Sequence, residues 1–68
     1  MADSELLTTE EVSQRYRVKE GTLRYWRSIG EGPAYFSLGR RIVYRLSECE
    51  RWVAEQEEAA ITRRAAAV

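Results

Sequence analysis

The sequence has no histidine, one cysteine, one proline and no long apolar run. Without histidine, the chain lacks the side chain that most often acts as acid and base near neutral pH. Its single cysteine, Cys49, excludes an internal disulfide and a cysteine cluster for zinc. No segment reaches the roughly 20 apolar residues of a membrane-spanning helix, and the acidic N-terminus lacks the apolar run of a signal peptide. We therefore expect a soluble protein of a reducing compartment.

The short chain leaves little room for an enzyme. At 68 residues it can form one domain with a small core. It contains no paired carboxylates at useful spacing, no nucleophile with a base beside it, and no phosphate-binding loop. The sequence therefore predicts a protein that is not an enzyme, with no catalytic residues, no metal site and no cofactor.

Charge is sorted along the chain although the formal net charge is zero. Residues 1–12 hold four acids and no base, residues 13–45 hold eight bases and two acids, and residues 46–68 hold three arginines and five glutamates. A basic middle segment between acidic ends gives one face a positive field, as a phosphate-binding surface needs. The alternative is that these arginines are ordinary surface residues.

Two helices separated by a three-residue turn are predicted over residues 9–16 and 20–29, which is the spacing of a helix-turn-helix. Thr8 and Glu11 have the spacing of a capping box at the start of the first helix. In the second, Leu23 and Trp26 point toward the core. The opposite side of that helix carries Glu20, Gly21, Arg24 and Ser28, with Tyr25 and Arg27 at its margins.

Two strand-like runs follow a Gly/Pro break at residues 30–33. The apolar positions alternate along both runs, at Phe36 and Leu38 and then at Ile42 and Tyr44. These four side chains share one face only if the loop has three residues, so we predict a loop over residues 39–41. It places Arg40 and Arg41 at the hairpin tip, projecting away from the core. The alternative is an ordinary solvated turn.

A third helix is predicted to begin with Ser47 as N-cap and Glu50 three residues later, as a second capping box. Its buried side carries Cys49, Trp52 and Val53, so Cys49 is interpreted as a small core residue and not as a nucleophile. The helical pattern fades after Glu55, and we expect fraying near Ala60. The predicted division is a disordered N-terminus (1–5), a folded domain (6–56) and a frayed helix or disordered tail (57–68), which could instead bind a partner.

Five short motifs carry a resemblance to a known family. They are Leu-Thr-Thr-Glu-Glu-Val (7–12), Gly-Thr-Leu-x-x-Trp (21–26), Gly-Pro (32–33), Leu-Gly-Arg-Arg-Ile-x-Tyr (38–44) and Ser-Glu-Cys-Glu-Arg-Trp (47–52). On these motifs the chain resembles the small MerR-like winged-helix proteins. These include the excisionases (recombination directionality factors) of phages and mobile elements and small transcriptional regulators. The resemblance implies a mainly α fold with a small β-hairpin, a winged helix-turn-helix of three helices plus a two-stranded wing.

The resemblance also assigns DNA-binding roles by position, with the second helix in the major groove and the wing on the backbone or in the minor groove. The implied base-reading residues are Glu20, Arg24 and Tyr25. The implied phosphate contacts are Lys19, Thr22 and Arg27, and the implied wing contacts are Arg40 and Arg41. The family often has a capping Ser or Thr before the Gly-Thr helix, and this chain departs from it with Lys19 and Glu20.

An excisionase of this type binds attachment-site DNA as several cooperating copies, bends it, and directs a phage-type integrase toward excision. The implied partners are double-stranded DNA, other copies of the chain and an integrase, with no membrane and no small-molecule substrate. The implied location is the nucleoid in the cytoplasm of a bacterial host. Two alternatives stay open at this point: a small winged-helix transcriptional regulator, and a protein-interaction module that uses the C-terminal segment.

Overall fold

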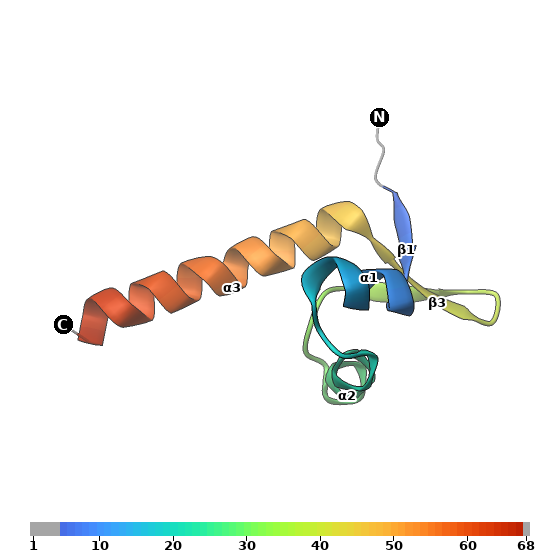
Figure 1. Ribbon diagram of the computed structural model, residues 1–68, viewed down its shortest axis with the longest axis horizontal. Helices are drawn as coiled ribbons and strands as arrows, with labels where there is room; N and C mark the ends of the chain where they lie inside the picture. The colour runs from blue at the N-terminus through green and yellow to red at the C-terminus, as the bar shows by residue number, and fades with distance from the viewer. Residues whose placement is uncertain (1–4, 68) are drawn as a thin grey trace.

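The computed structural model describes residues 5–67, with side chains up to residue 64. Within this range it has three helices and three short strands. In chain order they are β1 (Leu6–Thr8), α1 (Thr9–Tyr16), α2 (Glu20–Ile29), β2 (Tyr35–Leu38), β3 (Arg41–Arg45) and α3 (Leu46–Ala67). In Figure 1 the β2–β3 hairpin projects to one side and α3 extends to the other, with α1 and α2 between them. The predicted winged helix-turn-helix is confirmed. The disorder predicted for residues 1–4 and for Val68 concerns positions outside the described residues.

Helices α1 and α2 have the predicted bounds, and the capping box at the start of α1 is present. The Thr8 Oγ1 accepts the Glu11 backbone N–H at 3.1 Å, and the Glu11 carboxylate accepts the Thr8 N–H at 2.8 Å. The turn between the helices is closed by Arg17 in the left-handed conformation (φ 58°) and by a hydrogen bond from the Val18 N–H to the Ser13 carbonyl at 3.0 Å. Local signals therefore determine the helix-turn-helix geometry.

Strand β1 is an element that the sequence did not predict. It pairs antiparallel with β3 and makes the wing part of a three-stranded sheet of order β1-β3-β2. Leu7 lies opposite Tyr44, and just before the strand the Glu5 carbonyl accepts the Leu46 N–H at 2.8 Å. A three-residue strand is too short for a detectable alternation, and its partner lies far along the chain. Residue 5 is thus hydrogen-bonded, although the sequence placed it in the disordered N-terminus.

The prediction of a three-residue hairpin loop was wrong. Leu38 pairs with Arg41, so the turn contains only Gly39 and Arg40. Gly39 has φ +65°, as a glycine at the first central position of a type II′ turn requires, and this turn matches the twist of the flanking strands. The shorter loop splits the apolar set between two faces, because directly opposed residues share a face. Tyr44 and Ile42 belong to the core face, opposite Tyr35 and Ser37; Phe36, Leu38 and Val43 belong to the outer face.

The core lies between the inner face of the sheet and the three helices. Its buried residues are Leu7, Val12, Leu23, Tyr44 and Cys49. At its edge, the Trp26 ring lies 5.1 Å from the Trp52 ring, which joins α2 to α3. Gly32 has φ +82°, and a Cβ there would lie 3.0 Å from Trp26 Cε3, so glycine is required for the loop to pass over the ring.

Helix α3 differs from the prediction at both ends. It begins at Leu46 directly after β3, so Ser47 lies inside the first turn and is not the N-cap. It also continues to Ala67, beyond the expected fraying near Ala60. Alanine has the highest helix propensity, and Arg51 adds ion pairs with Glu48 and Glu55. Every described side chain from residue 54 to 64 is exposed. The boundary of the folded domain at residue 56 stays a prediction.

Cys49 is fully buried, and burial raises the pKa of its thiol to about 11, against the opposing effect of Arg15. We expect the folded protein to resist a thiol reagent at pH 8 and to react only on unfolding. The unfolded thiol ionises at lower pH, so the free energy of unfolding should fall as pH rises from about 9 to 11. Urea unfolding across this range would measure the fall. In Cys49→Ala the fall should be smaller, and an equal fall would contradict the assignment.

Candidate nucleic-acid interface

Helix α2 presents an exposed polar surface because its apolar residues are held in the core. Leu23 is 1% exposed, and Trp26 packs against the core cluster. The side chains of Glu20, Arg24 and Tyr25, which the sequence assigned to base reading, are all exposed. This face is therefore open to a partner along the length of the helix.

Glu20 and Arg24 lie one helical turn apart and form an ion pair of 3.8 Å between exposed side chains. Pairs of this kind contribute only about 0.3–0.5 kcal/mol, so a stronger acceptor can displace the glutamate. The arginine has five N–H donors in a planar fork, which matches the two acceptors of guanine in the major groove.

The N-terminus of α2 lacks a side-chain cap. Lys19 is the N-cap residue in extended conformation and makes no capping hydrogen bond. Its side chain is exposed, whereas Thr22 is half-buried one turn into the helix. Positive charge beside the free backbone N–H groups of a helix N-terminus favours an anion there. The predicted phosphate contacts of Lys19 and Thr22 stay predictions.

The wing, which is the β2–β3 hairpin, provides a basic surface in addition to the polar face of α2. Arg40 occupies the hairpin turn, and Arg41 is the first residue of β3, opposite Leu38, so the prediction that both lie in the loop holds only for Arg40. Both side chains are exposed, and within residues 5–67 neither forms an ion pair. Two unpaired guanidinium groups at a projecting tip can contact phosphates or a minor groove.

Arg27 is placed differently from the other predicted contacts. Its side chain is half-buried, and its Nη1 donates hydrogen bonds to the Tyr44 Oη at 2.7 Å and to the Thr9 Oγ1 at 3.3 Å. The guanidinium carbon also lies 5.6 Å from the centroid of the Tyr35 ring. All of these contacts are inside the domain. A phosphate contact by Arg27 is untested, but the structure directs this side chain toward the hairpin.

Two further arginines lie near this interface, and the sequence assigned no role to either of them individually. Arg17 is exposed in the turn between α1 and α2, and Arg45 lies at the end of β3 over the Phe36 ring, 6.0 Å from its centroid. Arg41 and Arg45 are four residues apart on one strand, so both belong to the outer face of the sheet. The excess of bases in residues 13–45 was the only sequence signal for either.

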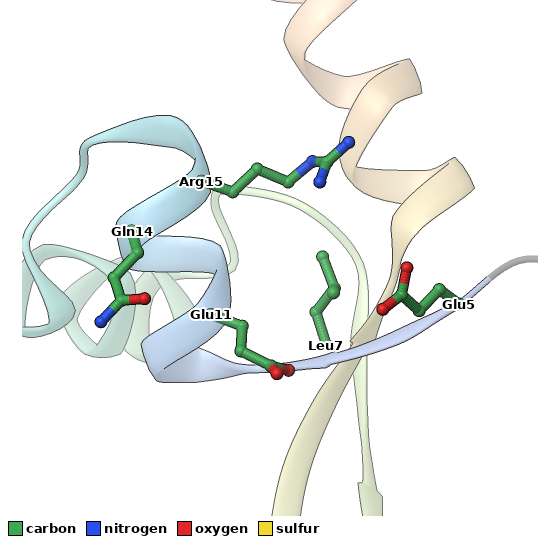
Figure 2. A pocket seen from close by; sticks show the side chains of 5 residues that line it. All are labelled: Glu5, Leu7, Glu11, Gln14 and Arg15. Carbon is green, nitrogen blue, oxygen red and sulfur yellow. The ribbon is translucent and has the colours of Figure 1, made fainter.

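The hollow beside β1 and α1 does not resemble a ligand site. Figure 2 shows the side chains of Glu5, Leu7, Glu11, Gln14 and Arg15 around it. Glu11 is already occupied in the capping box, and Arg15 lies 3.9 Å from Glu50 of α3.

Among the described residues, no three carboxylate, thiol or imidazole groups come together as metal ligands would. No helix between residues 5 and 67 is long and apolar enough to cross a membrane.

Comparison with known proteins agrees with this arrangement. The family model described as a helix-turn-helix domain matches residues 6–57, about three quarters of the chain, from β1 into α3. The chain has no significant match among curated proteins or among solved structures. The matching family binds DNA and includes excisionase-like proteins. The protein therefore belongs to the helix-turn-helix domain family and is a sequence-specific DNA-binding protein.

Proposed function

We propose that the protein is an excisionase of the MerR-like winged-helix type, an architectural factor without catalytic activity. It binds attachment-site DNA as several cooperating copies, bends it, and directs a phage-type integrase toward excision at the bacterial nucleoid. The observation that carries this proposal is the pairing of an exposed polar face on α2 with an exposed basic hairpin tip, in a chain whose motifs resemble the MerR-like winged-helix proteins that include excisionases. The helix would read bases and the tip would hold the backbone or the minor groove.

Cooperation between copies follows from the small size of the reading surface. Glu20, Arg24 and Tyr25 offer two or three base contacts, each worth about 1–3 kcal/mol of discrimination. Bending a site of 20–30 base pairs costs about 1–6 kcal/mol. One copy therefore binds weakly, and contacts between neighbouring copies must offset the bending energy.

The charge distribution supports a contact between neighbouring copies. Glu55, Glu57 and Glu58 are exposed on α3, which extends away from the hairpin (Figure 1). Arg40 and Arg41 are exposed at the opposite end of the molecule. The acidic middle of α3 and the basic hairpin tip carry opposite charge, which favours a head-to-tail row of copies along DNA.

A gel-shift titration tests the proposal, with an attachment-site fragment beside a scrambled fragment of equal length. Several complexes that form cooperatively on the attachment site alone would support an architectural factor. A single discrete complex, found instead on a promoter fragment, would favour a transcriptional regulator. If neither these nor other fragments are bound at low salt, DNA binding fails and a protein-interaction module, using the exposed part of α3, is the remaining hypothesis.

Arg24→Ala and Arg41→Ala should weaken DNA binding in different ways. Loss of Arg24 should reduce the affinity ratio between specific and scrambled DNA by roughly ten- to a hundredfold, because one base contact is lost. Loss of Arg41 should weaken both complexes about equally. Fluorescence anisotropy at fixed salt measures both constants. Arg63→Ala, which removes an exposed arginine far along α3, is the matched control. If Arg24→Ala leaves the ratio unchanged, the base-reading assignment is wrong.

A further inference from the structure

We infer that Arg27 positions the recognition helix relative to the wing through Tyr44, and that it is not itself a phosphate contact. This rests on the proposed use of α2 and the hairpin as the two DNA-binding elements. Arg27 lies in the last turn of α2. Its Nη1 bonds a hydroxyl from β3, that of Tyr44, and a hydroxyl from the first residue of α1, that of Thr9.

The same side chain also contacts the outer strand of the hairpin. The Arg27 guanidinium carbon lies 5.6 Å from the centroid of the Tyr35 ring, within the range of a cation–π contact. Tyr35 and Tyr44 are directly opposed in the sheet, and their rings lie 6.1 Å apart. One planar guanidinium therefore joins α2 to both strands of the wing, which a lysine ammonium cannot do in the same way.

The backbone arrangement makes this side-chain link important. Helix α2 packs on α1, whereas its backbone does not pack closely on β2 or β3. The hairpin is held to α2 by core packing of Leu23 and Tyr44 and, at the core edge, by the Arg27 cluster. A binding surface made of two elements needs their relative position fixed to within about 0.5 Å. Arg27 is placed to provide that constraint.

The burial of Tyr44 distinguishes a positioning role of Arg27 from a phosphate contact, because Tyr44 bonds Arg27 but cannot reach DNA. Tyr44 is 1% exposed, so its hydroxyl group is available only to Arg27 and not to a phosphate. Removing the hydroxyl in Tyr44→Phe keeps the ring in the core and deletes the hydrogen bond. Any change in DNA discrimination by folded Tyr44→Phe must then come through the position of α2 and the wing.

The test compares Arg27→Met, Arg27→Lys, Tyr44→Phe and the Arg27→Met/Tyr44→Phe double variant, each shown to be folded by circular dichroism. Anisotropy titrations at several salt concentrations give the affinity for specific and scrambled DNA. We expect each single variant to lose roughly three- to tenfold in the ratio of the two affinities. The double variant should lose no more than either single one, because both break one link. The salt slope on scrambled DNA should stay unchanged.

A phosphate contact would give the opposite pattern. Arg27→Met would then weaken both complexes equally and lower the salt slope by about 1, Arg27→Lys would bind almost as the wild type does, and Tyr44→Phe would be silent. That pattern, or an unchanged affinity ratio in all variants, overturns the inference while leaving the proposed function intact.

A measurement without DNA separates the inference from the proposed function. Residual dipolar couplings of the wild type and of Tyr44→Phe give the orientation of α2 relative to the β2–β3 hairpin. We expect that orientation to change or to spread in the variant, and an unchanged orientation overturns the inference. If the orientation changes while the wild type binds no DNA, the proposed function fails and the positioning role of Arg27 stands.

Discussion

Leu23→Ala is expected to remove most of the stability of the domain. Leu23 is 1% exposed and belongs to the core cluster, where it joins α2 to the sheet and to the other helices. Replacing a buried leucine by alanine costs about 2–5 kcal/mol, because apolar contacts are lost and a cavity remains. A single core of this size supplies only about 3–5 kcal/mol in total. Urea unfolding followed by circular dichroism should therefore find the variant largely unfolded near 37 °C.

The neighbouring residue provides the control for this prediction. Arg24 follows Leu23 on the same helix, but its side chain is exposed and forms only a weak ion pair with Glu20. Arg24→Ala should change the free energy of unfolding by no more than about 0.5 kcal/mol, as is usual for surface positions. If Leu23→Ala and Arg24→Ala unfold at the same urea concentration, the core does not hold α2 through Leu23.

Helices α1 and α2 could be predicted with their bounds because their signals are local. The Thr8–Glu11 capping box and the inward spacing of Leu23 and Trp26 act within one or two helical turns, and both are present in the structure. The strands depend on partners that the sequence does not identify. The three residues of β1 form a strand only because β3 is available beside them, more than thirty positions along the chain.

The hairpin illustrates where an alternation pattern becomes ambiguous. A three-residue loop would have put all four predicted apolar residues on one face, whereas Gly39-Arg40 also fits the Gly-X pair of a two-residue type II′ turn. The structure instead has the two-residue turn, with Gly39 at positive φ, and leaves Phe36 and Leu38 exposed on the outer face. Turn geometry thus determined the register more strongly than the burial of two large side chains.

The interface was predictable in outline and not in detail. The excess of bases in residues 13–45 indicated a phosphate-binding surface, and half of these eight bases (Lys19, Arg24, Arg40 and Arg41) are exposed at α2 and the hairpin tip. Sequence alone placed Arg27 at the margin of the polar face of α2, but it could not show that this side chain, unlike that of Arg24, bonds inside the domain. The difference depends on the Tyr44 hydroxyl, 17 residues farther along the chain, and on where the fold places it.

The affinity for DNA should fall steeply with salt even though the formal net charge is zero. The slope depends on how many phosphates the protein neutralises locally, because each contact releases condensed counterions. If Lys19, Arg40 and Arg41 each neutralise one phosphate, raising monovalent salt from about 50 to 200 mM should lower the affinity roughly 40-fold. Anisotropy titrations across this range measure the slope on specific and scrambled DNA.

Variants then identify which cations contribute to that slope. Replacing Arg40 and Arg41 together by alanine should lower it by about 2, whereas Arg63→Ala on distant α3 should leave it almost unchanged. A flat salt response in the wild type would contradict phosphate binding by these residues. An unchanged slope in the double variant would instead remove the wing from the interface and leave α2 to bind alone. Because a neutral chain has no strong long-range field, a steep slope would have to arise from the local sorting of charge onto α2 and the hairpin tip.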